Sequence, residues 1–175
     1  MTQKMFRIGR SRTGLGLFAT QEIGKGARIV EYSGRRIPTR TAKQMEWLKP
    51  NRYLFEIDRR WTIDGSSRRN LARYVNHACR PNAEAVLSRG RMIYRARRRI
   101  RADEEITVDY GREYFDLYLK ASGCLCQACI ERRRSKRRLA RMRAQRRSRK
   151  PLQSKRGRMT IRKRNASRKR KTGRR

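Results

Sequence analysis

Up to residue 131 the chain alternates short apolar runs with polar segments that contain glycine, proline or clustered charge. Most of these runs are rich in β-branched and aromatic residues, which favours strands over helices. Turn residues between neighbouring runs, such as Arg89-Gly90, indicate hairpins. The strands predicted in this way cover residues 4–12, 27–34, 53–57, 61–65, 85–87, 92–96 and 106–110.

The helical signal is weak by comparison. Residues 39–48 predict one short helix, with Thr39 or Thr41 as its N-cap, and Pro50 marks its end. Residues 113–119 form an aromatic-rich linker with room for one helical turn. Many short strands with so little helix indicate a mostly β fold made of several small sheets.

Residues 73–82 combine the chain's only histidine, one of its four cysteines, two asparagines and a proline. The amides of Asn76 and Asn82 can satisfy backbone groups that a regular ladder does not reach, and Pro81 favours a turn. Because this segment fits neither a plain helix nor a plain strand, we interpret it as a functional site.

Two glycines one residue apart, Gly14 and Gly16, leave two interpretations open. They allow a tight turn between two strands, or the close approach of a ligand to the backbone. A dinucleotide-binding fingerprint is a poor match, because the third glycine is missing and no long helical pattern follows.

Charge is spread unevenly along the chain. The protein has 175 residues and a formal charge of +37, and residues 132–175 carry +24 of it with no acidic side chain. This tail is too polar and self-repelling to bury a core, so we expect it to be disordered, or helical once its charge is neutralised. Counterion release favours sequence-independent binding of DNA or RNA by the tail.

The cysteines suggest a metal site. Cys124, Cys126 and Cys129 lie within six residues, and Cys79 is the fourth. Four thiolates match the closed tetrahedral site that Zn²⁺ prefers, and the metal would join Cys79 to the C-terminal segment. Reduced cysteines without a metal are the alternative.

We expect an intracellular protein with no membrane partner. The chain has no apolar run of about 20 residues, the length that spans a bilayer. Its first residues lack the apolar core of a secretory signal.

Four signals, in this order, resemble those of the SET-domain protein-lysine methyltransferases. They are Gly-Leu-Gly-Leu at 14–17, Tyr-Ser-Gly at 32–34, Arg-Tyr-Val-Asn-His-Ala-Cys-Arg-Pro-Asn at 73–82 and Glu-Ile-Thr-Val-Asp-Tyr at 105–110. The cysteines after Tyr110 resemble that family's post-SET segment. The resemblance implies a SET-like domain over 5–111, a zinc segment over 112–131 and a separate basic tail over 132–175. It also implies a β-clip-like fold in which the chain after Tyr110 crosses near Asn76 in a knot-like arrangement.

The resemblance also implies roles for individual residues. Tyr110 would be the catalytic tyrosine, and Tyr32 would line the lysine channel beside it. S-adenosylmethionine would lie against Gly14, Leu15, Gly16, Leu17, Phe18, Arg73, Asn76 and His77, and Zn²⁺ would be held by Cys79, Cys124, Cys126 and Cys129. The substrate would be a lysine of a basic, nucleic-acid-associated protein, histone-like or ribosomal, in the nucleoid of a bacterium or the chromatin of a eukaryote.

The chemistry suits these residue types. The pKa of lysine in water is about 10.4, and both the dry channel and the positive sulfonium lower it. A larger fraction of the lysine is then the neutral amine, which can attack the methyl group. A protein this positive should nevertheless repel a basic substrate. Either Asp103, Glu104 and Glu105 form a negative groove, or nucleic acid bridges enzyme and substrate, and we favour the bridge. The alternative function is a non-catalytic, zinc-stabilised nucleic-acid-binding or packaging protein.

Overall fold

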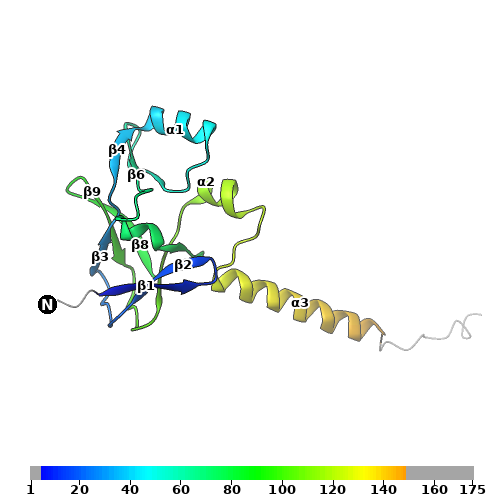
Figure 1. Cartoon of the computed structure of the whole chain (residues 1–175). Helices are drawn as coiled ribbons and strands as arrows, with labels where there is room; N and C mark the ends of the chain where they lie inside the picture. The colour runs from blue at the N-terminus through cyan, green and yellow to red at the C-terminus, as the bar shows by residue number, and fades with distance from the viewer. Residues whose placement is uncertain (1–4, 149–175) are drawn as a thin grey trace, which may run out of the picture. The chain divides into compact units, whose positions relative to one another are not determined.

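The computed structural model describes residues 5–148, and its strands form three small sheets (Figure 1). The mostly β fold that the apolar pattern predicts is therefore confirmed. Within the described residues no helix is long and apolar enough to cross a membrane. The chain divides into two units between Arg133 and Arg134, inside the last helix of the described residues.

The first sheet has four strands in the order β1-β2-β10-β7: Phe6–Ser11, Gly14–Ala19, Glu105–Val108 and Asn76–His77. Strands β1 and β2 form a hairpin, and β10 pairs antiparallel with β2 on one side and parallel with β7 on the other. Residues far apart in the sequence thus lie side by side at β7, where the segment ending in Tyr110 meets the segment around Asn76.

The other two sheets have three strands each. One has the order β3-β9-β8, from Arg28–Glu31, Arg91–Ala96 and Ala83–Ser88, and the other has the order β4-β6-β5, from Arg35–Pro38, Trp61–Asp64 and Leu54–Glu56. The turn between β8 and β9 is Arg89-Gly90, as expected, with both residues at positive φ. Inward-facing residues of all three sheets form one core, which includes Leu17, Ile63, Tyr94 and Ile106.

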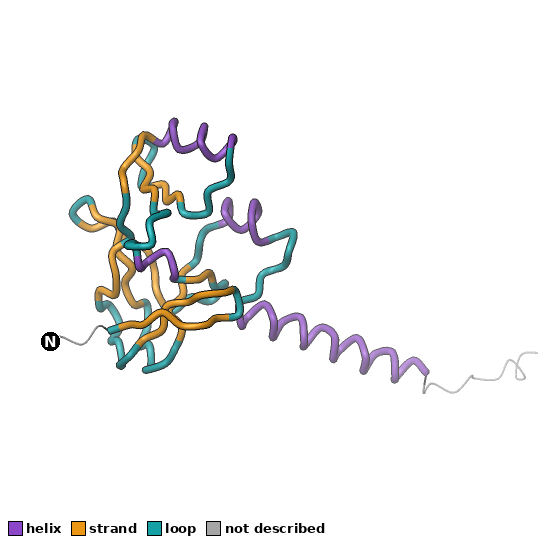
Figure 2. The backbone as a smooth tube through the Cα atoms, in the orientation of Figure 1, coloured by secondary structure: helices purple, strands orange, loops and turns teal. Residues whose placement is uncertain are grey.

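Helices occupy few positions in the first unit, as the tube in Figure 2 shows. Helix α1 spans Thr39–Leu48, and a 3₁₀ turn at Leu71–Tyr74 precedes β7. Helix α2, Arg112–Tyr114, continues into a π-helical turn at Phe115–Leu119, where the sequence leaves room for one helical turn. Helix α3 spans Gln127–Ser148.

The structure makes the sequence-based prediction more specific at the first turn and in the tail. The tight turn falls at Arg12-Thr13, one step before the glycine pair, and Gly14 opens β2 with a φ of +116°. The tail is helical as far as Ser148, which is one of the two states that the charge pattern allowed. The remainder of the tail, from residue 149, lies outside the described residues.

Candidate active site and cysteine cluster

The central feature of the first unit is a cavity of about 430 Å³ between the three sheets and the segment after Tyr110. A second cavity, of about 400 Å³, shares Asn76 and His77 with it. The site is therefore approached from two sides that meet at β7. Of the candidate site residues, the first cavity is lined by Leu15, Tyr32, Arg73, Asn76, His77, Tyr110, Cys124 and Cys126.

Tyr110 is half-buried at the end of the β10 segment. Its hydroxyl donates a hydrogen bond of 2.7 Å to the carbonyl oxygen of Val75. Burial raises the pKa of Tyr110, and the nearby phenols of Tyr114 and Tyr32 add to the shift. At neutral pH the ring therefore carries a protonated hydroxyl, held by Val75, whose oxygen can accept a hydrogen bond from a ligand.

Tyr32 also lines the cavity and belongs to the core. Its hydroxyl donates to the carbonyl oxygen of Tyr53 at 2.9 Å, and its ring lies 5.2 Å from Phe55 and 6.0 Å from Tyr94. Burial raises its pKa as well. A side chain added at Gly65 would meet the Tyr32 hydroxyl at 2.5 Å, so glycine is needed there.

Arg73 contributes the cavity's unpaired polar atom. Its guanidinium lies 4.0 Å from the centre of the Tyr53 ring, and one terminal nitrogen donates to the carbonyl oxygen of Ser66. The Nε atom is buried and has no hydrogen-bond partner among the described residues. A buried donor without a partner costs about 1–3 kcal/mol, so an anionic ligand group at this wall would be stabilised.

The residues of strand β2 have two different environments, one at the cavity and one in the core. Leu15 is half-exposed and lines the cavity, and Gly14 and Gly16 flank it. Leu17 is fully buried in the core and paired to strands on both sides, and Phe18 lies beneath Arg7. Gly14, Gly16, Leu17 and Phe18 line neither cavity, so a ligand beside β2 would meet Leu15 and the neighbouring Thr13.

Asn76 holds β2, β7 and β10 together. Its Nδ2 donates to the carbonyl oxygen of Leu15 at 3.0 Å and to a carboxylate oxygen of Glu105 at 2.7 Å. A side chain at Gly16 would meet that same carboxylate at 2.6 Å, which explains the glycine. Asn82, which is buried, ties its loop to β10 through the Thr107 backbone N–H at 2.8 Å.

His77 connects the tyrosine to the cysteines. Its Nδ1 accepts a hydrogen bond of 3.2 Å from the backbone N–H of Tyr110, and its Nε2 lies 3.4 Å from the sulfur of Cys79. Burial lowers the pKa of His77, and Asp109 opposes that shift only in part. The ring is thus neutral at pH 7, with its proton on Nε2 and directed at the sulfur.

The four cysteines lie together, and their sulfur atoms are all within 4.8 Å of one another. The Cys79 sulfur is 3.9 Å from that of Cys124 and 3.5 Å from that of Cys129. A tetrahedral zinc with sulfur ligands at about 2.3 Å needs sulfur atoms about 3.8 Å apart, so the cluster fits this metal. Burial raises the pKa of Cys79 and Cys124, whereas backbone N–H groups of Cys79 and Cys129 outweigh burial at Cys126 and lower its pKa to about 7, so Cys126 is the thiol of these three that ionises most readily.

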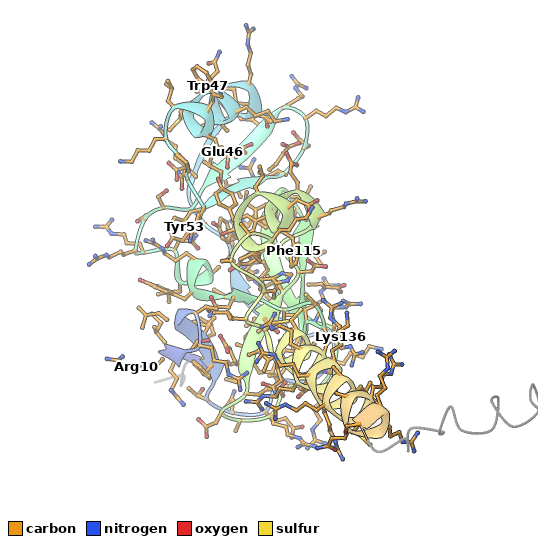
Figure 3. All side chains as sticks on the ribbon, turned by 90° about the vertical axis from the view of Figure 1, so that its right-hand side faces the viewer. Arg10, Glu46, Trp47, Tyr53, Phe115 and Lys136 are labelled. Atoms are coloured by element: carbon orange, nitrogen blue, oxygen red, sulfur yellow. The ribbon has the colours of Figure 1, made fainter. Side chains whose placement is uncertain are left out.

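Sequence reasoning missed several lining residues of the cavity. Tyr53, Phe55 and Tyr94 come from strands whose aromatic residues fit an ordinary core. Tyr114 comes from the aromatic-rich linker, and its ring lies 4.6 Å from that of Tyr110 (Figure 3 labels the neighbouring Phe115). Helical spacing could not have found Tyr114 from Tyr110, because Tyr110 precedes α2 and Gly111 between them has a φ of +84°.

Comparison with known proteins gives one consistent answer. A histone-lysine N-methyltransferase of Caenorhabditis elegans, set-2, is 37% identical over 136 residues, which cover 72% of this chain and 9% of that protein. An H3 lysine-4 specific histone-lysine N-methyltransferase of Saccharomyces cerevisiae is 35% identical over 122 residues, covering 65% of this chain and 11% of that protein. Human histone-lysine N-methyltransferase SETD1A is 35% identical over 134 residues, which cover 71% of this chain and 8% of that protein. The chain thus spans about a tenth of the length of these curated relatives.

A solved structure and a family model agree with these relatives. A humanized mutant of the Chaetomium thermophilum Polycomb Repressive Complex 2, bound to the inhibitor GSK343, aligns with a TM-score of 0.56 and 28% identity, covering 63% of this chain and 15% of that one. The family model described as the SET domain matches residues 14–111, more than half of the chain. This protein belongs to the SET-domain family.

Proposed function

We propose that this chain is a protein-lysine N-methyltransferase that uses S-adenosylmethionine and acts on a basic, nucleic-acid-associated protein such as a histone. The single observation that carries the proposal is the cavity in which Tyr110, Tyr32, Arg73 and the Asn76-His77 strand face one space. The names of the relatives, histone-lysine N-methyltransferases, point to the same reaction and substrate class. Such a substrate would place the protein on chromatin or, in a bacterium, on the nucleoid.

S-adenosylmethionine, when bound, supplies an electrophilic methyl group. The buried Nε of Arg73 offers a donor to a carboxylate, and Leu15 and the Asn76-His77 strand supply the wall where the two cavities meet. These groups fit a ligand with one anionic end that extends across β7. Their task is to hold that ligand in one orientation.

The aromatic walls act on the substrate lysine. Tyr32, Phe55, Tyr94 and Tyr110 exclude water, and desolvation favours the neutral amine over the ammonium ion. The Tyr110 hydroxyl is held by Val75 and remains protonated, so it can orient the amine nitrogen without ionising. Alignment of this kind supplies several kcal/mol of barrier reduction.

The cysteine cluster is a zinc site in this proposal. Cys124 and Cys126 also line the cavity, so a metal that fixes them would fix one wall of the active site. The zinc would therefore be structural, with all four positions taken by sulfur and none open for substrate.

The tail supplies the affinity for nucleic acid in this proposal. The structure weakens the rival idea of a negative groove, because Asp103 forms an ion pair with Arg7 at 2.9 Å and Glu104 one with Arg98. Glu105 is occupied by the amide of Asn76. With these acids neutralised or bound, a polyanion that attracts both partners explains how a positive enzyme meets a positive substrate.

Substitution of Tyr110 tests the activity. We expect Tyr110→Phe to lower kcat for methyl transfer from radiolabelled S-adenosylmethionine to histone by about a hundredfold, the usual effect of losing one positioned hydrogen-bonding group. Tyr118→Phe is the control, because the Tyr118 hydroxyl donates to Glu46 and does not line the cavity. Equal activity of wild type and Tyr110→Phe would show that the phenol has no catalytic role.

Calorimetry tests cofactor binding separately from turnover. We expect wild type to bind S-adenosylmethionine and Arg73→Gln to bind it about tenfold more weakly, because a charge-assisted hydrogen bond is lost. Arg68→Gln, which changes an exposed arginine in the turn just before the 3₁₀ segment of Arg73, serves as the matched control. If wild type shows no binding, the non-catalytic nucleic-acid-packaging function replaces the proposal.

A further inference from the structure

Helix α1 presents an unusual face to solvent. Its apolar residues Trp47 and Leu48 are 87% and 77% exposed, while Ala42 on the other face is buried. Figure 3 shows Glu46 on the side of α1 nearer Tyr53, where it accepts a hydrogen bond from Tyr118, and Trp47 on the outer side. The helix is thus anchored through one face, and its large aromatic residue is left on the other.

This outer face forms one wall of an open groove of about 780 Å³. The other wall is the turn between β5 and β6, which contributes Arg59, and Thr39 is buried beneath. Apart from Thr39 the lining residues are Arg40, Lys43, Gln44, Trp47, Leu48 and Arg59, three of them cationic and none acidic. The spacing of Arg40, Lys43 and Trp47 places all three on one side of the helix.

The cations of the groove are only weakly neutralised. Lys43 lies 3.5 Å from a carboxylate oxygen of Glu56, and both side chains are largely exposed, so this pair contributes little. Neither Arg40 nor Arg59 forms an ion pair within the described part of the chain. The groove therefore offers positive charge together with a bare indole face.

We propose that this groove binds single-stranded nucleic acid, with one base stacked on Trp47 and the flanking phosphates on Arg40 and Arg59. Aromatic rings interleaved with cations are the usual means of binding single strands without sequence preference, because every base has a π-face. A duplex buries its base faces and could offer only its phosphates. The groove would thus distinguish single strands from duplexes, which a purely cationic tail does not do.

An acidic peptide is the competing occupant. It would satisfy Arg40 and Arg59 but would leave the indole uncovered, because aspartate and glutamate have no flat apolar surface. Trp47 therefore favours the nucleic acid. The proposal requires neither methyl transfer nor binding by the tail, so each of the three can fail alone.

Fluorescence of the full chain tests the groove. The protein has two tryptophans, and Trp61→Phe leaves Trp47 as the sole indole emitter. At about 0.3 M salt, which weakens phosphate contacts of the tail, we expect unstructured oligothymidylate to quench Trp47 several-fold and a duplex of equal charge to leave it unchanged. Arg40→Gln with Arg59→Gln should weaken this quenching and lower the salt slope by about 1.4, since each single-strand phosphate contact contributes about 0.7.

Three outcomes would overturn the inference. The first is a Trp47 emission that stays unchanged when the single strand is saturating, as judged by the anisotropy of a labelled strand. The second is equal quenching of Trp47 by the duplex, and the third is equal quenching by polyglutamate. Should Trp61→Phe fail to fold, photocrosslinking of wild type to a bromouridine strand replaces it, and the crosslink is expected on Trp47. A crosslink confined to α3 would count against the groove.

Discussion

At the scale of single residues, His77 has the most demanding position in the site. Its two ring nitrogens serve different elements, with Nδ1 accepting the backbone N–H of Tyr110 and Nε2 directed at the sulfur of Cys79. The ring also lies 5.5 Å from the ring of Tyr110 and 5.7 Å from that of Phe115. His77 is therefore a positioning residue that links the cysteine cluster to the tyrosine.

Two substitutions separate its two contacts. In His77→Asn, the asparagine Oδ1 can replace the histidine Nδ1 as the acceptor for the Tyr110 backbone N–H, but no donor reaches the Cys79 sulfur. In His77→Gln, the glutamine Nε2 can still donate to the Cys79 sulfur, but the acceptor for the Tyr110 N–H is lost. Groups that orient metal ligands are typically worth 10- to 100-fold in metal affinity or activity. We expect His77→Asn to lose about tenfold in zinc affinity, measured by chelator competition, and His77→Gln to lose about tenfold in kcat. An identical loss of both quantities in both variants would indicate that the ring only fills space.

Several of the candidate residues that the sequence identified have side-chain chemistry that is rare in a small core. A lone histidine, four cysteines and the asparagine pair could be recognised without coordinates, and so could Tyr110 at the end of a strand. Tyr53 and Tyr94 could not, because an aromatic residue that lines a cavity has the same pattern as one that fills a core. The division of residues 14–18 between cavity and core also depended on β10 pairing with only Leu17 and Phe18 of β2.

At the scale of elements, the strands with clear apolar alternation were predicted, and those held by pairing alone were missed. Strand β4 reads Arg-Arg-Ile-Pro, which looks like a turn, yet it forms an edge strand against β6, where proline is tolerated. Strand β7 has only two residues, too few for any pattern. Helix α1 was expected over Thr39–Leu48, but its N-cap is Pro38 and not Thr39 or Thr41, and the exposure of Leu48 could not be read from its spacing.

The loop before β10 depends on Glu104. Burial alone would raise the pKa of this carboxyl, but hydrogen bonds from Arg98, the Arg101 backbone and the Asn82 amide outweigh it and hold the pKa below its usual range. Two of these bonds are 3.0 Å long, from Asn82 Nδ2 and from the Arg101 N–H. The ionised form is thus favoured in the folded state.

This shift predicts a pH dependence of stability. A carboxyl with a depressed pKa stabilises the fold fully above its unfolded value, about 4.3, and the contribution is lost as the pH falls through the folded value. We expect Glu104→Gln to cost about 1 kcal/mol at pH 7, discounted for partial exposure, and to cost almost nothing near pH 3. Urea unfolding at both pH values measures the difference, with Glu84→Gln, an exposed carboxylate in a long ion pair of 3.9 Å, as the control. A deficit that persists unchanged at pH 3 would contradict the assignment.

At the scale of the whole molecule, charge separates the two parts of the chain. Residues 132–175 hold +24 of the +37, and all 14 acidic residues precede them. In the first unit many acids are neutralised locally, as in the pairs of Glu22 with Arg99 and Asp103 with Arg7. The tail has no such partners in its own sequence, so its charge is available to an external polyanion.

Truncation after Arg133 isolates the contribution of the tail. This end point keeps Cys129 and Arg132, whose guanidinium lies 3.9 Å from the Cys129 sulfur, and it matches the boundary between the two units. We expect the shortened chain to methylate a free lysine peptide within about twofold of wild type, because the cavity belongs wholly to the first unit.

On a DNA-bound substrate the two chains should differ. Six to ten phosphate contacts weaken binding by about 10³- to 10⁵-fold between about 50 and 200 mM salt, so the full chain should be far more active at the lower salt and lose that advantage at the higher. Full-length protein with Lys136, Arg137 and Arg138 changed to glutamine should fall between the two, since it retains the helix but fewer charges. Equal activity of full and shortened chains on the DNA-bound substrate at low salt would mean that the substrate reaches the cavity without a nucleic-acid bridge. The repulsion between two basic proteins would then have to be relieved within the first unit, where Asp109 and Glu131 line the cavities beside Glu104 and Glu105, whose carboxylates are already paired with Arg98 and Asn76.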